Sequence, residues 1–326
     1  MSTTTPHGSL HQRVIAWYDL EARDLPWRGG DRSAWGVLVS EIMLQQTPVV
    51  RVLPVWQEWM ERWPAASSLA ADSAGEAVRR WGRLGYPRRA LRLHAAAISI
   101  VEEHSGQVPG SYSELLKLPG VGSYTAAAVA AFAFGHRETV IDTNIRRVQA
   151  RLVGGDALAQ PSLTAAETRR ATELLPVDAQ WSVRWNSAVM ELGAVLCTAR
   201  SPRCGQCPVL DSCAWVQAGK PAPAYIPKGQ PWAGTDRQVR GAIMAVLRQC
   251  SQPLPPELLL GTPVDLAVGP TLFAPAPELG AAVAHLHSLG SPSEQLERAL
   301  AGLLRDGLAE ETTTGVQLPT NSASAL

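Results

Sequence analysis

Four of the five cysteines of this chain fall within 17 residues, with the spacing C-x6-C-x2-C-x5-C, and this grouping limits the possible folds more than any other feature of the sequence. They are Cys197, Cys204, Cys207 and Cys213. Four thiolates this close together can hold one metal centre, since the C-x2-C step lets two sulfurs reach the same site. Zinc and a 4Fe-4S cluster both accept four cysteines, but zinc usually takes two C-x2-C pairs, so the spacing favours iron and sulfur. Four unlinked buried thiols are the alternative, and Cys250 lies outside the pattern.

The charges of the chain balance, with 29 Lys plus Arg against 29 Asp plus Glu, and 46% apolar residues exclude wholesale disorder. Residues 1–220 hold 23 basic and 20 acidic side chains and residues 221–326 hold 6 and 9, so any basic surface for a polyanion is expected in the first part. Residues 1–9 lack the basic and apolar stretches of a signal peptide, and the apolar run 126–134 is too short to span a bilayer. We therefore expect a soluble, cytoplasmic protein without a membrane partner.

Apolar residues recur at helical spacing through the first part of the chain, for example at Leu10, Val14 and Trp17. No strand-like alternation occurs before residue 300, so the first 220 residues are expected to be all-α. The proline-rich stretch 220–231 is typical of a linker.

Beyond the linker, the sequence predicts a small C-terminal α+β unit. Its expected elements are a helix over 237–248, a proline-rich loop over 251–277, a helix from a capping box at Ser291 and Glu294 to Gly307, and a hairpin of 308–312 and 316–318 around Gly315. Helices followed by a hairpin indicate a winged-helix-like arrangement.

The segment LPGVG at 118–122 separates a short capped segment from the small-residue helix 123–134. Gly120 and Gly122 permit a tight turn between two helices and leave the first amides of the second helix without partners. Such amides, with the helix dipole, can hold a phosphate oxygen of DNA without reading bases. An ordinary hairpin of two helices is the alternative.

Two carboxylates are candidates for acid and base chemistry. Glu41 lies among apolar residues, and burial would raise its pKa toward that of a general acid near neutral pH; a surface position on an amphipathic helix is the alternative. Asp142 precedes a helix and is expected to be its N-cap. Hydrogen bonds from the helix amides to its carboxylate would keep Asp142 ionised. A protonated Glu and an ionised Asp are the pair that cleaves a glycosidic bond through an oxocarbenium-like state.

The glycine hairpin, Asp142 and the cysteine spacing together resemble the helix-hairpin-helix DNA glycosylases that carry an iron-sulfur cluster, a superfamily that includes endonuclease III and the MutY-type adenine DNA glycosylases. Three features resemble the adenine branch. These are the segment RDLPWR at 23–28, the segment VSEIMLQQT at 39–47, and Tyr124 at the position of the Schiff-base lysine of endonuclease III. The match covers about residues 10–220.

The resemblance implies a role for each matched residue. Glu41 would protonate adenine at N7, Asp142 would stabilise the oxocarbenium ion, and Tyr124 and Asn144 would line the catalytic pocket. The residues expected to hold the extruded base are Arg23, Leu25, Trp27 and Arg28; those expected to wedge into the base stack are Gln46 and Tyr86; those expected to grip the DNA backbone are Gly120 and Gly122. The four cysteines would bind a 4Fe-4S cluster.

The implied fold is mainly α, a two-lobed helix-hairpin-helix glycosylase with an iron-sulfur loop and the small C-terminal unit. The expected parts are an N-terminal helix packing with the cluster lobe (1–30), a helical barrel lobe with the hairpin (31–139), the cluster lobe (140–219), a linker (220–235) and the C-terminal domain (236–326). We expect a monomer that acts on double-stranded DNA with a mismatched or damaged base pair.

The implied activity is hydrolysis of adenine paired with 8-oxoguanine or guanine, leaving an abasic site, because no lysine stands where a strand-cutting lyase needs its amine. Two alternatives are an endonuclease III-like glycosylase for oxidised pyrimidines and a noncatalytic DNA-binding module. Two features depart from the family. Ser187 stands where relatives often carry Gln or Glu, and residues 221–326 do not resemble the Nudix-like domain that usually recognises 8-oxoguanine.

Overall fold

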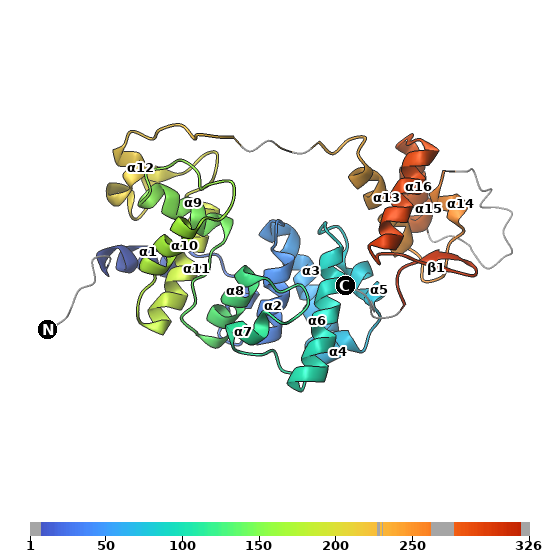
Figure 1. The fold of residues 1–326 in the computed structure, drawn as a ribbon, viewed down its shortest axis with the longest axis horizontal. Helices are drawn as coiled ribbons and strands as arrows, with labels where there is room; N and C mark the ends of the chain where they lie inside the picture. The colour runs from blue at the N-terminus through green and yellow to red at the C-terminus, as the bar shows by residue number, and fades with distance from the viewer. Residues whose placement is uncertain (1–7, 227–228, 230, 262–276, 321–326) are drawn as a thin grey trace. The chain divides into compact units, whose positions relative to one another are not determined.

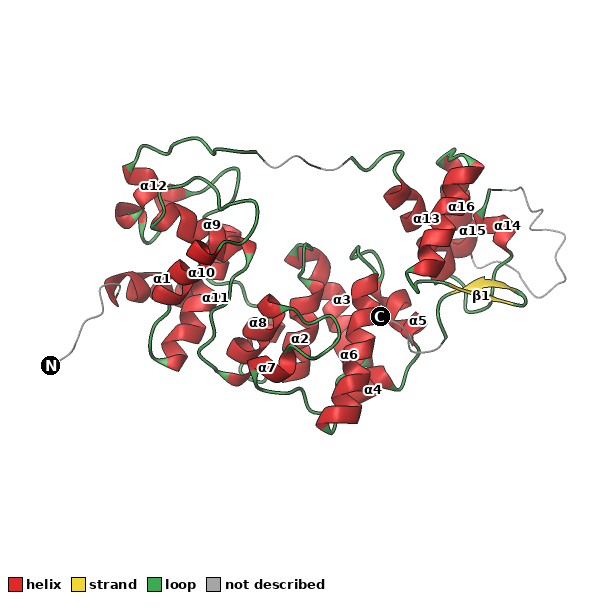
Figure 2. Cartoon of the chain, viewed as in Figure 1, coloured by secondary structure: helices red, strands yellow, loops and turns green. Residues whose placement is uncertain are grey.

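In the described part of the chain, short helices follow one another from Gly8 to Arg305, and the first 220 residues are helical as the apolar spacing predicted. The computed structural model describes residues 8–226, 229, 231–261 and 277–320, drawn as ribbons in Figures 1 and 2. In this part of the chain, the first named strand begins at Glu310. None of the described helices has the length and apolar character to cross a membrane.

The chain forms two compact units, each made of two stretches of sequence. The first unit is Met1–Glu41 with Val108–Lys228, and the second is Ile42–Gln107 with Gly229–Leu326. These units divide the expected lobe 31–139 at Glu41 and Val108, so the glycine hairpin falls in the unit that holds the cysteines. The five-part division expected from the sequence stays a prediction.

The first unit surrounds one apolar core. Helices α1 and α9 pack against α11, and Val14, Ile145, Trp185 and Leu192 are among the core residues that they bury. The elements are α1 (Gly8–Glu21), η1 (Pro26–Arg28), α2 (Ala34–Met43), α7 (Tyr112–Leu115), α8 (Ser123–Phe134), α9 (Thr143–Leu152), α10 (Ala165–Glu173), α11 (Ala179–Val195), η2 (Cys204–Gln206), η3 (Leu210–Ser212) and α12 (Ala214–Gln217). The last two residues of α2 belong to the second unit.

The second unit begins with a helical lobe in which α4 and α5 pack against α6. Three buried tryptophans, Trp59, Trp63 and Trp81, meet edge to face at its centre, with ring centroids 4.7 and 5.5 Å apart. The helices of the lobe are α3 (Val49–Arg62), α4 (Ala66–Ala70), α5 (Ala74–Trp81) and α6 (Arg88–His104).

The C-terminal part of the second unit has the expected order of helices followed by a hairpin. Helix α13 packs against α15 and α16, and the antiparallel hairpin pairs Glu311 with Val316. Leu254 adds an isolated antiparallel bridge to Val316, so a short extended segment between helices joins the hairpin, as in a winged helix. The elements are α13 (Asp236–Arg248), α14 (Pro256–Leu259), α15 (Pro277–Ser288), α16 (Ser293–Arg305), β1 (Glu310–Thr312) and β2 (Gly315–Gln317).

Two details of this part differ from the sequence expectation. The predicted capping box at Ser291 is wrong, because α16 begins later and its N-cap is Pro292. The proline ring has no polar atom that could accept a hydrogen bond from a helix amide. The stretch 251–261 is not all loop, since Pro256 opens the short helix α14. Proline is tolerated there because its missing N–H would have no partner in the first turn. The rest of the predicted loop, residues 262–276, lies outside the described residues.

Candidate active site and metal centre

Glu41 lies near the end of α2 with only 4% of its surface exposed, so the expected burial is confirmed. Burial raises the pKa of its carboxyl from 4.5 to about 7, and the negative charge of Asp142 adds to the rise. The Tyr124 hydroxyl donates a hydrogen bond of 2.6 Å to Glu41 Oε2 and, like the charge of Arg28, partly opposes the shift. A carboxyl with a pKa near 7 can give up a proton at neutral pH.

Asp142 is the N-cap of α9, as the sequence predicted. Its Oδ1 accepts from the Ile145 amide at 2.6 Å, and its Oδ2 accepts from Asn144 Nδ2 at 2.7 Å. Burial raises the pKa of Asp142 above its ordinary value, while the hydrogen bonds from Ile145 and Asn144 lower it.

The negative charge of Asp142 raises the pKa of Glu41, so an ionised Asp142 favours a protonated Glu41. Asp142 accepts from two N–H donors, whereas Glu41 accepts from a single hydroxyl. N–H donors stabilise the ionised form of a carboxyl, so the proton belongs on Glu41 and the charge on Asp142. This arrangement supplies one acid and one anion at the same site.

Glu191, which the sequence did not single out, holds the segment 23–28 in place, where the residues expected to hold the extruded base lie. Arg23 Nε donates to its Oε1 at 2.6 Å, and Arg28 Nη2 lies 2.9 Å from its Oε2. The side chain of Glu191 is 0% exposed, and its pKa is lowered because these guanidinium groups outweigh its burial. Leu25 and Trp27, between the two arginines, are 4% and 5% exposed.

One hydrogen-bond donor of Arg28 has no partner among the described residues. This donor, Nη1, is buried, and the same guanidinium acts on the pKa of both Glu41 and Tyr124. A buried N–H without a partner is costly, so a ligand with an acceptor atom would be held there.

The glycine hairpin has the expected turn. Gly120 adopts a φ of 77°, which favours glycine, and Gly122 is the N-cap of α8. No side chain caps the first amides of α8, which leaves them for an acceptor from outside. Tyr124 lies in the same first turn, so one helix end carries both the exposed amides and the hydroxyl on Glu41.

The four clustered cysteines line one hollow that is partly open to solvent. Cys197 follows α11, Cys204 begins η2, and Cys213 caps α12, so the tight loops between these elements turn the four thiols toward one space. Arg151 donates from Nη1 to Cys197 Sγ at 3.3 Å and stacks 4.7 Å from the ring of Trp215. A donor set of four thiols that line one hollow fits an iron-sulfur cluster.

Arg147 joins the cluster loop to the carboxylate site. Its Nε donates to the Cys197 carbonyl at 2.7 Å, and its Nη2 donates to Asn144 Oδ1 at 2.8 Å. Asn144 in turn donates to Asp142. Gly193 lies so close to Asn144 that an added Cβ would come within 2.7 Å of the Asn144 Cβ, so only glycine fits there. This link could not be predicted from the sequence, because Cys197 and Gly193 lie about 50 residues after Asn144 and Arg147.

Gln46 and Tyr86 belong to the second unit and lie on two of its turns. Both adopt a left-handed backbone conformation, with φ values of 57° and 47°, and Tyr86 is 52% exposed. This backbone conformation costs free energy for a residue with a side chain. It is common at functional sites, where a residue must point outward.

A single buried guanidinium, that of Arg89, holds both turns. It donates to the Gln45 carbonyl at 2.6 Å, to Thr47 Oγ1 at 2.9 Å and to the Gly85 carbonyl at 3.0 Å, and it lies 5.6 Å from the Tyr86 ring. Burial lowers the pKa of Arg89 to about 10, which still leaves it charged at neutral pH. The sequence analysis missed Arg89 because an arginine on a helix gives no sign of burial.

Comparison with known proteins assigns this architecture to a class. Residues 39–173 match the family model of HhH-GPD superfamily base excision DNA repair proteins, and residues 197–213 match the iron-sulfur binding domain of endonuclease III. The solved structure of a thermostable thymine-DNA glycosylase is 26% identical, with a TM-score of 0.58 over 64% of this chain and 96% of that one. An endonuclease III–DNA complex is 23% identical with a TM-score of 0.56, which supports the fold. These matches define a helix-hairpin-helix base excision repair protein with an iron-sulfur cluster.

The curated relatives narrow the class. An adenine DNA glycosylase of Mycolicibacterium smegmatis is 47% identical over 93% of this chain and 93% of its own length, and one of Mycobacterium tuberculosis is 44% identical over 96% and 94%. The human adenine DNA glycosylase is 41% identical over 64% of this chain and 39% of its own length. The chain belongs to the adenine DNA glycosylase family of this superfamily. The expected 4Fe-4S cluster, rather than zinc, is thereby confirmed.

Proposed function

We propose that this protein hydrolyses the N-glycosidic bond of adenine paired with 8-oxoguanine or guanine in double-stranded DNA, and that it leaves an abasic site without cutting the strand. The observation that carries the proposal is the buried pair of Glu41, whose pKa is about 7, and Asp142, which is held by N–H donors. Such a pair provides the acid and the anion that an oxocarbenium-like reaction needs.

In this proposal, Glu41 gives its proton to N7 of adenine. The bond between C1′ and N9 then breaks, and its electron pair leaves with the base, which the added proton has made a better leaving group. Asp142 stabilises the positive sugar, and Asn144 orients its carboxylate through the 2.7 Å hydrogen bond. A water adds to C1′ and releases its proton to the carboxylate pair. The four cysteines would hold the 4Fe-4S cluster, and Arg147 connects their loop to Asn144.

Tyr124 supports hydrolysis over lyase chemistry. It stands at the position of the lysine of endonuclease III, and its hydroxyl is engaged by Glu41. A phenol there cannot form the imine through which a lyase cuts the strand.

The remaining matched residues extend the proposal from chemistry to base extrusion. Leu25, Trp27 and Arg28 hold the extruded adenine, with Arg28 Nη1 as a donor to the base, and Arg23 fixes the segment through Glu191. Gln46 and Tyr86 fill the space that the base leaves in the stack. The amides after Gly120 and Gly122 hold a backbone phosphate. The protein acts as a monomer in the cytoplasm, on the nucleoid if the cell is bacterial.

The test is single-turnover excision from duplexes with A opposite 8-oxoguanine, with strand breaks measured before and after alkali. We expect breaks only after alkali, and loss of excision by at least about 100-fold in Glu41→Gln and Asp142→Asn with duplex affinity retained. Breaks without alkali, or release of oxidised pyrimidines instead of adenine, would favour the endonuclease III-like alternative. Binding that both variants retain, with no base released by the unaltered protein, would favour a noncatalytic module.

A further inference from the structure

Two arginines pair with Asp306, the C-cap of α16, and a third, Arg305, precedes it in the chain. Arg240 of α13 pairs with Asp306 Oδ2, and Arg88 Nη1, at the start of α6, lies 3.5 Å from Asp306 Oδ1. A Cβ added at Gly302 would collide with Arg240 and lie 3.8 Å from Arg305 Nη2, so these two guanidinium groups converge beside it. We call Arg88, Arg240, Arg305 and Asp306 the Asp306 cluster.

The Asp306 cluster carries more positive than negative charge. The neighbouring carboxylate Asp236 is engaged by Arg298 at 2.8 and 2.9 Å, and this pairing lowers the pKa of Asp236 to about 2. The Arg88 side chain is 44% exposed, and Arg305 is exposed as well, so both donors can reach a ligand in solvent. Several guanidinium groups that share one carboxylate repel one another and favour an added anion.

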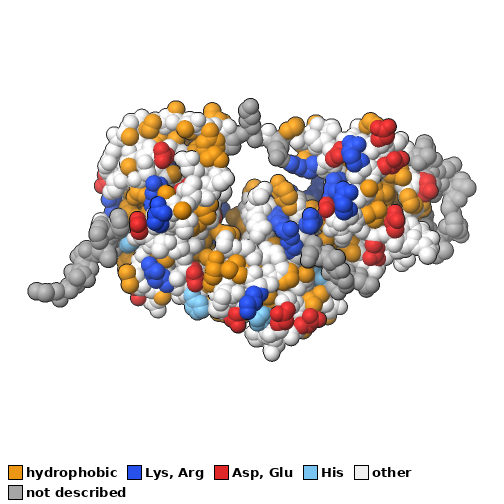
Figure 3. All heavy atoms as spheres, in the orientation of Figure 1, with side chains coloured by type: hydrophobic (Ala, Val, Ile, Leu, Met, Phe, Trp, Pro, Cys, Tyr) orange, Lys and Arg blue, Asp and Glu red, His pale blue; other side chains and the backbone are white. Residues whose placement is uncertain are grey.

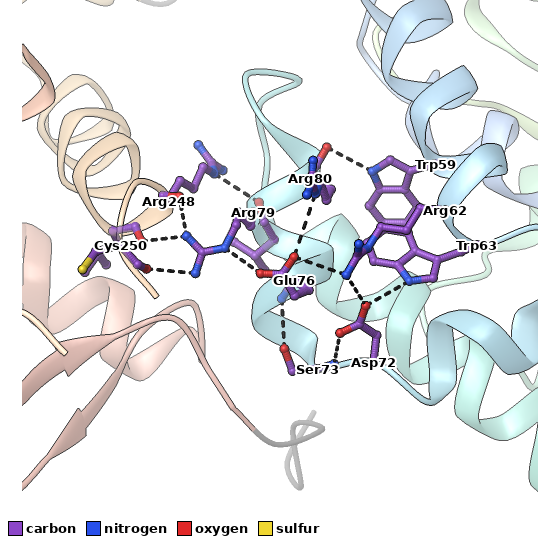
Figure 4. Close-up of polar contacts among 12 residues, drawn as sticks. Trp59, Arg62, Trp63, Asp72, Ser73, Glu76, Arg79, Arg80, Arg248 and Cys250 are labelled. Carbon is purple, nitrogen blue, oxygen red and sulfur yellow. Dashed lines mark hydrogen bonds and ion pairs between the residues drawn. The ribbon is translucent and has the colours of Figure 1, made fainter. Parts of the chain in front are cut away.

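The C-terminal part is fixed to the lobe that supplies Arg88. Figure 4 shows Arg79 of α5 pointing at the end of α13, where it donates to the Arg248 carbonyl and, at 2.9 Å, to the Cys250 carbonyl. Arg248 Nε donates back to the Val78 carbonyl at 3.1 Å. The Gly75 amide donates to the Pro319 carbonyl at 2.8 Å. These contacts hold the arginines of both parts together before any ligand binds.

The surface that a winged helix usually offers to DNA is poorly suited to phosphate in this chain. Among the exposed charged residues of α16, Glu294 and Glu297 balance Arg298 and Arg305, and Arg298 is already paired with Asp236. The exposed residues of the hairpin include Glu311 and no Lys or Arg. Figure 3 shows acidic side chains over the outer part of these helices and basic ones nearer the lobe. The hairpin and the first turns of α16 therefore offer no net positive charge to a nucleic acid.

We propose that the Asp306 cluster binds a phosphate of the DNA backbone, and that the C-terminal part meets DNA through this site rather than through its hairpin. The inference rests on the proposed function for its ligand, because Arg88 follows Tyr86 by two residues and Tyr86 is placed at the extruded base. The phosphate bound would belong to the strand beside the lesion. This gives the C-terminal part a backbone-positioning role that carries no base specificity.

The test measures the affinity for duplex DNA as a function of salt in the full chain. Arg305→Ala and Arg240→Gln should each weaken binding by about three- to tenfold and reduce the slope of log K against log salt by about 1. The loss of affinity and the decrease in slope should each be the same on a duplex with A opposite 8-oxoguanine as on a fully paired duplex. The control is Arg62→Ala, which removes an arginine of the same unit with 42% side-chain exposure from its ion pair with Asp72. Slopes that equal that of the control would overturn the proposal.

The variant Asp306→Asn should change the affinity for duplex DNA in the opposite direction. If the site binds phosphate, removal of the competing carboxylate should tighten duplex binding and steepen the salt dependence; if the cluster only holds the fold together, binding should weaken, which contradicts the proposal. Inorganic phosphate is the second probe. Binding of free phosphate that depends on Arg305, with unchanged salt slopes on DNA, would assign the site to a small anion and would also overturn it. Fully paired DNA needs no excision, so this test stands even if the protein releases no adenine.

Discussion

The chemistry of Glu41 depends on where its carboxyl lies, since a glutamate in water would be ionised at neutral pH. Burial raises its pKa to about 7, and the Tyr124 hydroxyl restrains the rise. Asp142 is also buried but accepts from two N–H groups, so the pair divides into an acid and an anion. At the level of single residues, the hydrogen-bond donors decide which carboxyl keeps the proton.

We predict that excision falls as pH rises through about 7, where Glu41 loses its proton. Tyr124→Phe removes a hydrogen bond that lowers this pKa, so the fall should move to higher pH, by about one unit. Single-turnover rates from pH 5 to 9 measure the shift. A fall that moves to lower pH would mean that Tyr124 does not stabilise the ionised form.

We predict that Arg89→Lys lowers excision about tenfold or more, because an ammonium group cannot reach both turns that the guanidinium joins. The loss should shrink when adenine is already unstacked, for example opposite an abasic-site analogue, and should be absent in a Tyr86→Ala background. Single-turnover rates measure both effects. Arg92→Lys, at an exposed position of the same helix, is the control. Equal losses on both substrates would make Arg89 a purely structural residue.

At the level of elements, helix ends place the reacting groups. The N-terminus of α9 carries Asp142, and the first turn of α8 carries Tyr124 beside its uncapped amides. Helix α11 supplies the support, because Glu191 on it holds the segment with η1 and Gly193 allows Asn144 to approach. Each of these positions is fixed by backbone geometry, which is stiffer than a loop.

We predict that Glu191→Gln destabilises the protein by about 3 to 5 kcal/mol, because it leaves Arg23 and Arg28 without their buried counter-charge. Urea unfolding of the cluster-containing protein measures the change. Arg184→Ala on the same helix removes an exposed ion pair with Asp19 and should cost less than about 1 kcal/mol. A similar small cost for both variants would show that Glu191 is not a structural anchor.

At the level of the whole molecule, the C-terminal residues complete the second unit. They pack against the lobe through hydrogen bonds to backbone carbonyls and pair Asp306 with Arg88 of that lobe. The mycobacterial relatives match over almost the whole chain, whereas the human protein matches over 64% of it. The human relative therefore leaves about a third of this chain unmatched.

We predict that Arg79→Met loosens the C-terminal part, because three carbonyl groups at the end of α13 lose their donor. Hydrogen exchange should become faster in residues 247–250 and in α5, with thermal unfolding several degrees lower. Arg80→Met, on the same helix with a 48% exposed side chain, is the control. Unchanged exchange in both segments would show that this contact does not hold the C-terminal part.

The sequence determined the all-α class, the cysteine cluster, the glycine turn and the pair of Glu41 and Asp142, because each depends on local spacing or on a motif of contiguous residues. It also indicated the C-terminal hairpin, while it placed the start of α16 too early. Local patterns do not fix a helix start when several residues compete for the cap.

Only the tertiary structure decided which groups support the site. Glu191, Arg147 and Arg89 act through contacts to residues far from them in the chain, and nothing in their neighbouring sequence marks them as buried. The titration of Asp142 was also decided there, because burial and hydrogen bonds oppose one another and their balance depends on packing. Local sequence patterns specified which residues the site contains. Long-range packing specified which residues support them and which carboxyl carries the proton.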